Sequence, residues 1–217
     1  MNFRVKFIGL GGQGIQLAGK LLGEAGFKQG LNVSQGVIYE PATSGGITIA
    51  DISLADKDTE ILYPFIETPN ILVIFAQRGW DEFKSNVDEN TIVLADLDNV
   101  QEFDDEYSKK ARLAFHLPFS RIARELGSEK VTNVVIIGFI SEMLDVGENF
   151  VPGMLNDANP EDAEEYELLE VEPEHFEASL ISASPEKFKE LNMKAFKAGY
   201  QLSLDQDYSK NEIVHLE

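Results

Sequence analysis

Hydrophobic and polar residues alternate at the start of the chain and then give way to a helical spacing. Phe3, Val5 and Phe7 share one side of an extended segment, which predicts a strand over residues 3–9. A glycine-rich loop follows at residues 9–14. Behind it, apolar residues recur at intervals of three to four: Ile15, Ala18, Leu21, Leu22 and Ala25. The chain therefore opens with a predicted strand, loop and helix.

Four segments further along the chain carry strand patterns. Residues 31–35 are a candidate second strand, and the side chains of residues 47–54 alternate with a period of two, which predicts another strand. Residues 70–76 and 91–96 are short continuous apolar runs. Such runs are typical of strands that helices bury on both faces, as in a parallel sheet.

Helical spacing recurs between and after these strands. Four further helices are predicted, over residues 80–86, 119–126, 134–144 and 185–202. Asn133 is a candidate N-cap for the third, and Pro185 suits the first turn of the last. Strands that alternate with helices predict an α/β fold, here a Rossmann-like three-layer domain with a mostly parallel sheet. We place this domain at residues 1–203, followed by a C-terminal tail over residues 204–217.

The charge balance excludes several classes of partner. The 217 residues include 18 Lys and Arg against 38 Asp and Glu, a net charge of −20. Because phosphates and anionic lipids attract basic side chains, nucleic acids and membranes are poor partners. Cysteine is absent, so the chain offers no thiolate to an iron–sulfur cluster or zinc. No secretory signal is visible and no apolar run reaches the roughly 20 residues of a membrane span, so we expect a cytoplasmic protein.

One segment is strongly acidic. Residues 156–177 contain ten Asp and Glu and neither Lys nor Arg. This composition is typical of a solvated excursion or a flexible loop. We therefore treat residues 156–180 as an acidic insertion in the domain. Its alternative function is that of a docking arm against a basic surface of a partner.

The glycine loop, Gly9-Leu10-Gly11-Gly12-Gln13-Gly14, satisfies the pattern G-x-G-x-x-G between a strand and a helix. Glycines let the backbone approach a ligand closely, and the N-terminus of the following helix attracts a phosphate. The interpretation as an NAD site also requires an acidic residue at the end of the second strand. That strand is expected to end near Gly36, and Glu40 comes later, inside the next loop. NAD binding is therefore disfavoured.

Two other interpretations of the loop stay open. It is either a tight turn that packs helix against strand or the site of another ligand. Gln13 bears on the choice, because a packing turn needs no long amide there. Its side chain is a candidate hydrogen-bonding group for a ligand or partner subunit, and the alternative is that it faces water.

Several motifs together resemble the gamma subunit of the 2-oxoacid:ferredoxin oxidoreductases. They are Gly9-x-Gly11-Gly12-Gln13-Gly14 with Leu17-Ala18-Gly19-x-Leu21, Tyr39-Glu40-Pro41-Ala42-Thr43-Ser44-Gly45-Gly46, Pro69-Asn70-Ile71-Leu72-Val73, Asn133-Val134-Val135 with Gly138, and Asn192-x-x-Ala195-Phe196-x-x-Gly199-Tyr200. The resemblance covers residues 3–155 and 185–202. The first two motifs form a specific pair, and the later ones are individually weak.

The resemblance implies a function that this chain performs only inside a complex. The family oxidatively decarboxylates a 2-oxoacid, pyruvate or 2-oxoglutarate, to an acyl-CoA and CO₂ while ferredoxin or flavodoxin is reduced. Thiamine diphosphate with Mg²⁺ and the iron–sulfur clusters lie on alpha, beta and delta subunits. The gamma subunit implied here holds no cofactor alone and contributes no catalytic residue or metal ligand. It covers the active-site mouth and helps to bind coenzyme A.

The two glycine-rich loops are the contacts that the resemblance implies. The cofactor-binding candidates are Gly9, Gly11, Gly12, Gln13, Gly14, Ser44, Gly45 and Gly46. Many gamma subunits have Arg-Gly-Gly in the second loop, whereas this chain has Ser-Gly-Gly, similar to single-chain pyruvate enzymes and slightly in favour of pyruvate. Serine offers a hydroxyl but no charge to a phosphate. The alternatives are a pure assembly subunit and a stand-alone nucleotide-binding protein.

Other polar residues offer weaker candidates. Asp96 and Asp98 follow a predicted strand, where a Mg²⁺ site is conceivable, although a polar loop is favoured. Arg78 is a candidate phosphate contact, and Trp80 is an interface anchor or ordinary core. His116 is expected to be structural.

Overall fold

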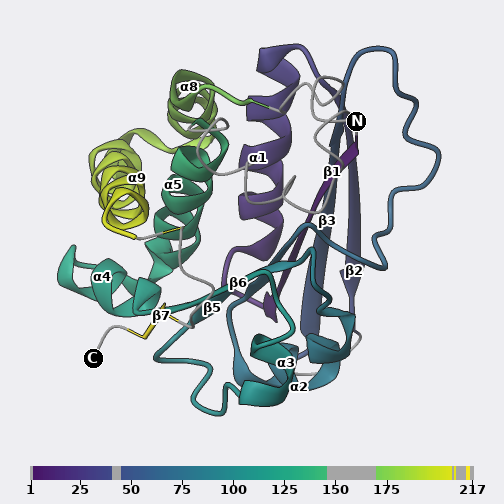
Figure 1. Cartoon of the computed structure of the whole chain (residues 1–217). Helices are drawn as coiled ribbons and strands as arrows, with labels where there is room; N and C mark the ends of the chain where they lie inside the picture. The colour runs from purple at the N-terminus through teal and green to yellow at the C-terminus, as the bar shows by residue number, and fades with distance from the viewer. Residues whose placement is uncertain (1, 41–44, 146–169, 207, 209–213, 216–217) are drawn as a thin grey trace.

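The computed structural model describes residues 2–40, 45–145, 170–206, 208 and 214–215 (Figure 1). Its strands are β1 (Asn2–Leu10), β2 (Asn32–Tyr39), β3 (Ile47–Ala55), β4 (Ile71–Ile74), β5 (Ile92–Asp96), β6 (Leu113–Leu117) and β7 (Val214–His215). They form one sheet in the order β2-β3-β1-β4-β5-β6-β7. β3 runs antiparallel to its neighbours β1 and β2. The other neighbouring pairs, β1 with β4, β4 with β5, β5 with β6 and β6 with β7, are parallel. The predicted α/β fold with a mostly parallel sheet is confirmed.

Helices cover both faces of the sheet, unequally. They are α1 (Ile15–Gln29), α2 (Gln77–Phe83), α3 (Asp105–Ser108), α4 (Phe119–Glu125), α5 (Thr132–Asp145), α8 (Pro173–Ala183) and α9 (Lys189–Leu204), with 3-10 turns η1 (Lys84–Asn86), η2 (Glu129–Val131) and η4 (Glu186–Phe188). α1, α4, α5, α8 and α9 lie on one face, and the short α2 and α3 lie on the other (Figure 1). The alternation along β1 supplies both cores, because Phe7 packs under α1 while Ile8 packs beside Trp80 of α2.

Several boundaries differ from the prediction because pairing partners decide them. β2 continues to Tyr39 instead of ending near Gly36, since residues 36–39 pair with residues 48–51 of β3. β6 was not predicted, and its place is set by parallel pairing with β5. α5 starts at Thr132, so Asn133 is inside the helix and is not its N-cap.

The end of the acidic segment is helical, which corrects the expectation of a solvated excursion there. α8 begins at Pro173, and Phe176 in its first turns is 1% exposed. Its ring packs against the ring of Phe196 in α9 at 6.4 Å between centroids. Residues 156–169 of the predicted insertion lie outside the described residues.

The closest helix packing joins α5 and α9. A side chain at Gly138 would overlap the carbonyl oxygen of Phe196, and one at Gly199 would overlap that of Val135. The two backbones therefore touch where two glycines face each other. This close approach explains the glycines of the last two sequence motifs by packing alone. In the described part of the chain, no helix combines the length and apolar character that a membrane crossing needs.

Candidate functional site

The first glycine loop, residues 9–14, connects the carboxyl end of β1 to the N-terminus of α1. Gly12 and Gly14 have φ angles of 97° and 77°, in the left-handed region that favours glycine. A Cβ at Gly14 would lie 2.5 Å from Asn133 Nδ2, and that amide donates to the Gly14 carbonyl oxygen at 3.2 Å. The start of α1 is thereby fastened to α5.

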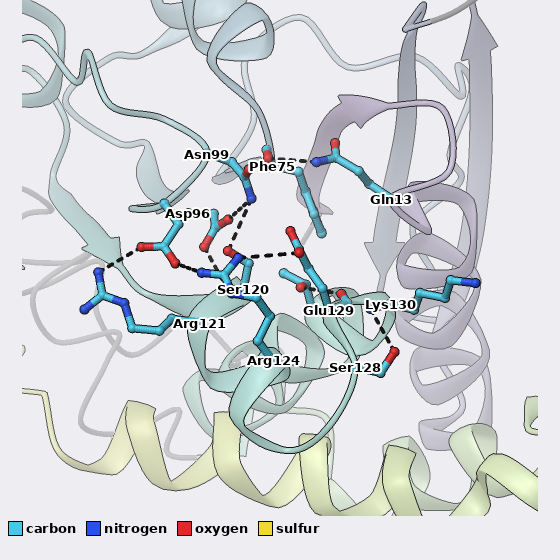
Figure 2. A network of polar contacts seen from close by, with 12 residues as sticks. Gln13, Phe75, Asp96, Asn99, Ser120, Arg121, Arg124, Ser128, Glu129 and Lys130 are labelled. Carbon is cyan, nitrogen blue, oxygen red and sulfur yellow. Dashed lines mark hydrogen bonds and ion pairs between the residues drawn. The ribbon is translucent and has the colours of Figure 1, made fainter.

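Gln13 uses its side chain inside the protein. Its Oε1 accepts a hydrogen bond from the Leu10 backbone N–H at 2.6 Å, and its Nε2 donates to the Phe75 carbonyl at 3.1 Å. The amide therefore ties the end of β1 to the end of β4 (Figure 2). Gln13 therefore has a positioning role inside the chain, and since it also lines the pocket beside the loop, its direct contact with a ligand stays a prediction.

The second glycine loop, residues 39–46, lies against the first. The Gly11 N–H donates to the Gly46 carbonyl at 3.1 Å. Gly45 has a φ of 70° and is exposed. Ser44 lies outside the described residues, so its predicted contact is neither placed nor tested. The described glycines of the two predicted motifs are thus brought together at one edge of the sheet.

Arg78 of α2 holds the second loop in place. Its Nη1 and Nη2 pair with the Glu40 carboxylate at 2.8 and 2.9 Å, its Nε donates to Glu82 at 2.7 Å, and its Nη1 reaches the Gly45 carbonyl at 3.3 Å. The hydrogen bonds that Arg78 donates to Glu40 and Glu82 raise the pKa of Arg78, and the bond from Arg78 lowers the pKa of Glu40. Arg78 therefore holds both ends of the second loop, and the carboxylates of Glu40 and Glu82 offset its charge.

The longer β2 places an acidic residue where the NAD interpretation required one. Glu40 follows Tyr39 directly at the end of this strand. The geometry nevertheless differs from a dinucleotide site, because β3 separates β2 from β1 in the sheet. Arg78 and the Ile47 N–H, the latter at 3.1 Å, also occupy the Glu40 carboxylate. NAD binding stays disfavoured, now for these structural reasons.

The glycines of the loops fall into two groups. A Cβ at Gly9 would meet Ile15, Gln13 and Phe75 within 2.9 Å, so internal packing explains that glycine. A Cβ at Gly11, Gly12 or Gly45 would meet no atom of the described chain within 4 Å. Gly11 also has no left-handed φ. Nothing inside the described chain requires a glycine at that position.

A pocket of about 350 Å³ opens beside the first loop. It is lined by Gly12, Gln13, Phe75, Asn99, Glu129, Lys130 and Thr132. Phe75 and Asn99 follow β4 and β5, so the pocket lies at the carboxyl ends of three neighbouring parallel strands. β1 leads into α1 on one face and β4 into α2 on the other, which is the crevice where open α/β sheets bind ligands.

Sequence reasoning missed most of this lining. Phe75 and Asn99 each come directly after a buried strand, and that position was a usable signal. Lys130 comes from η2 and Thr132 from the start of α5, 116 or more residues after the loop, and no local pattern links them to it. The exposed Lys130 side chain extends away from the polar network around Asn99 (Figure 2).

Asp96, at the end of β5, holds the side chain of Asn99, one of the residues that line the pocket. Its side chain is fully buried, and its two oxygens accept hydrogen bonds from the Ser120 N–H at 2.9 Å and from Asn99 Nδ2 at 2.5 Å. Burial raises the pKa of Asp96, although these hydrogen bonds act in the opposite direction. Asp96 therefore orients Asn99 toward the pocket and joins β5 to α4.

Asp96 and Asp98, for which a Mg²⁺ site was conceivable, bind different partners. Asp98 accepts a hydrogen bond from Arg121 Nη2 at 2.9 Å and pairs also with Arg124, while Asp96 faces Asn99. Although partial burial acts to raise it, the pKa of Asp98 is lowered by the two arginines. Among the described residues no group of His, Asp and Glu has the geometry of a metal site.

Two aromatic candidates are structural. Trp80 is fully buried, its Nε1 donates to Asp104 at 3.2 Å, and its ring lies 4.4 Å from that of Phe103. It is a core residue and not an interface anchor. His116 is 4% exposed, with Nε2 2.7 Å from the Val100 carbonyl oxygen, as expected for a structural histidine.

Known proteins resemble this chain in sequence and in structure. The sequence profile of the family described as pyruvate ferredoxin/flavodoxin oxidoreductase matches residues 4–202. The 2-oxoglutarate synthase subunit KorC of Methanocaldococcus jannaschii is 26% identical over 205 residues, which cover 94% of this chain and 95% of that protein.

Solved structures share the fold. The gamma subunit of a keto/oxoacid ferredoxin oxidoreductase from Geobacter sulfurreducens PCA superposes with a TM-score of 0.70 and 24% identity, covering 94% of this chain and 97% of that one. The 2-oxoglutarate:ferredoxin oxidoreductase of Magnetococcus marinus, solved with 2-oxoglutarate, coenzyme A and succinyl-CoA bound, gives a TM-score of 0.74 at 18% identity. This match covers 99% of this chain but 33% of that longer one.

Proposed function

Because the chain belongs to the pyruvate ferredoxin/flavodoxin oxidoreductase family, we propose that it is the gamma subunit of a 2-oxoacid:ferredoxin oxidoreductase complex. In this proposal the complex converts a 2-oxoacid and coenzyme A into an acyl-CoA and CO₂ and passes the electrons to ferredoxin or flavodoxin. The chain acts by binding and covering, and contributes no reacting group.

The observation that carries the coenzyme A contact is the open space at the loop glycines. A Cβ at Gly11, Gly12 or Gly45 would have no neighbour within 4 Å, and these glycines lie on two loops joined by the bond from Gly11 to Gly46. A glycine without an internal reason is expected where a ligand approaches the backbone. Gly11 is such a glycine, whereas the left-handed φ angles of Gly12 and Gly45 also favour glycine there. The open space at all three positions supports a ligand that lies across both loops.

The surroundings suit a phosphate-bearing ligand. The first backbone N–H groups of α1, a helix of 15 residues, point toward the first loop and attract anions. Lys130 adds a positive charge at the pocket and Glu129 a negative one. The bonds of Gln13 fix the first loop, and those of Arg78 hold Glu40 and Gly45 on either side of residues 41–44 of the second.

In this proposal the two loops cover the mouth of a partner's active site. Such a cover would keep water away from the reactive acyl group until coenzyme A captures it. Thiamine diphosphate with Mg²⁺ and the iron–sulfur clusters, which supply the decarboxylation and electron transfer, belong in our proposal to alpha, beta and delta subunits. The absence of cysteine from this sequence is consistent with that division.

Two kinds of observation bear on which 2-oxoacid the complex uses. The M. jannaschii relative and the M. marinus enzyme are both named for 2-oxoglutarate, whereas the sequence Ser44-Gly45-Gly46 favours pyruvate. We therefore propose 2-oxoglutarate as the first substrate to test and pyruvate as the second.

The decisive experiment is an anaerobic purification of the tagged chain from its own cells. We expect larger subunits to co-purify together with iron and thiamine diphosphate, and the eluate to reduce ferredoxin when a 2-oxoacid and coenzyme A are added. A chain recovered alone, without either cofactor, would contradict the proposal. A pure assembly subunit would give the same co-purification, but loop substitutions would then leave the KM for coenzyme A unchanged.

A further inference from the structure

Exposed hydrophobic side chains gather around β2, the edge strand of the sheet. Nine large hydrophobic side chains are exposed among the described residues, and six of them belong to β2, to the end of α1 beside it, or to the connection over residues 56–70. These six are Phe27, Ile38, Tyr39, Leu62, Tyr63 and Phe65, which we call the β2 surface. Leu62 is 83% exposed and Tyr63 is 66% exposed. Exposed apolar side chains that are concentrated on one part of a protein surface are typical of interaction sites.

The connection over residues 56–70 is held firmly against β2. Asn32 Nδ2 donates to the carbonyls of Asp56, Lys57 and Thr59 at 3.0–3.2 Å, at the start of the strand. At its other end, the Ile66 N–H donates to the buried Asp51 at 3.0 Å. In Figure 1 this connection runs alongside β2 and β3. Leu62 and Tyr63 therefore project from a segment that is tied down on both sides of them.

The strand itself offers an open edge. β2 is the terminal strand, and within the described residues only β3 pairs with it. On the α1 side of this edge, a hollow of about 570 Å³ is lined by Lys20, Gly23, Glu24, Phe27, Lys28, Val33 and Gln35. An unpaired strand edge with apolar side chains on both sides can accept an extended segment of another chain.

The charges around the β2 surface indicate which kind of partner it can bind. The connection carries Asp56, Asp58, Glu60 and Glu67 against a single Lys57, and the whole protein has a net charge of −20. A second copy of this chain would bring those carboxylates face to face, and like charges at an interface oppose association. On the side of the connection, the apolar side chains among these carboxylates instead complement an apolar segment flanked by Lys or Arg. On the α1 side, the hollow is lined by Lys20 and Lys28 as well as Glu24.

We propose that the β2 surface docks a different subunit of the same oxidoreductase, through an extended apolar segment with basic flanks that lies along β2. This inference rests on the proposed function for the identity of the partner. It assigns assembly to a surface that shares only Tyr39 with the glycine loops and no residue with the lining of their pocket.

The test is retention in the assembled complex. The chain is co-expressed with its larger subunits, one of which carries the tag, and the amount of this chain recovered is measured. Leu62→Asp/Tyr63→Asp should reduce recovery at least tenfold. The matched control is Ile181→Asp/Leu204→Asp on α8 and α9, where the replaced side chains are 48% and 51% exposed and recovery should match the wild type.

A charge reversal tests the carboxylates of the connection independently. Asp58→Lys/Glu60→Lys should lower recovery at least threefold at low salt. The same change of net charge on η4 and α9, Glu186→Lys/Glu190→Lys, should leave it unchanged. Sedimentation of the isolated wild-type chain should give a monomer, and circular dichroism should show that each variant is folded.

Three results would overturn the inference. Recovery of the Leu62→Asp/Tyr63→Asp variant at the wild-type level would remove the β2 surface from assembly. If the isolated wild-type chain forms a dimer and the Leu62→Asp/Tyr63→Asp variant is a monomer, the β2 surface would bind a second copy of this chain instead. Failure to recover the wild-type chain with the tagged larger subunit would overturn the proposed function, and with it the identity of this partner.

Discussion

Replacing Gly11 by alanine separates ligand binding from folding more cleanly than any other change at the loops. Gly11 is exposed, has no left-handed φ, and leaves a Cβ with no neighbour within 4 Å. The folded chain should therefore accept the methyl group without strain. Where the backbone is compatible, Gly→Ala stabilises a protein by about 0.4–1 kcal/mol because it restricts the unfolded chain. We expect the isolated variant to be as stable as the wild type or slightly more stable.

The same methyl group should obstruct coenzyme A. An extra carbon forced into a close contact typically costs about 1–3 kcal/mol. Since about 1.4 kcal/mol is a factor of ten in an equilibrium constant, the KM for coenzyme A should rise roughly 5- to 150-fold. The KM for the 2-oxoacid should stay unchanged, because its pocket belongs to the partner subunits in our proposal.

The assay is 2-oxoacid-dependent reduction of ferredoxin by the assembled complex, with coenzyme A varied. Gly14→Ala serves as the contrast, because its φ of 77° and the 2.5 Å approach to Asn133 Nδ2 should destabilise the fold itself. An unchanged KM for coenzyme A in a Gly11→Ala complex that retains this chain in full would refute the ligand contact.

Three further predictions concern stability. Lys6→Met should lower the free energy of unfolding by about 3–5 kcal/mol in urea titrations, since it leaves Asp51 charged and buried after the loss of a 2.8 Å ion pair; a loss below about 1 kcal/mol would contradict this. Burial raises the pKa of Glu142 above its ordinary 4.5, so the folded state binds more protons and stability falls as pH rises from there through the folded pKa. Glu142→Gln should flatten that slope in thermal unfolding, and an unchanged slope would count against it. Gly138→Ala should destabilise by about 3 kcal/mol or more, because its methyl group overlaps the Phe196 carbonyl of the adjacent helix; wild-type denaturant midpoints would disprove the close packing.

Local pattern was sufficient for the elements that it predicted well. The first strand was placed at residues 3–9 and spans Asn2–Leu10, and the strand predicted at residues 47–54 is β3. In each case the periodicity comes from neighbours a few residues apart along the chain, which a single sequence records. The absence of cysteine and the excess of carboxylates are likewise complete in the sequence.

β6 and α8 carry too little local signal to be found that way. β6 has five residues and includes a histidine, and its register is set by β5. The first turns of α8 lie in the acidic segment, and Phe176 is buried only because α9 supplies Phe196. Contacts between distant segments therefore decided both elements.

The sequence by itself determined that two glycine-rich motifs exist and that the first joins a strand to a helix. The folded chain was needed to show which of their described residues are held by internal contacts and which have open space around them. Gln13 reaches Phe75 across 62 residues and Asn133 reaches Gly14 across 119, so the bonds that hold the first loop come from separate strands and helices. Side-chain chemistry is written in the sequence, but a hydrogen bond also needs a partner in place, and folding alone brings such partners to about 3 Å from each other.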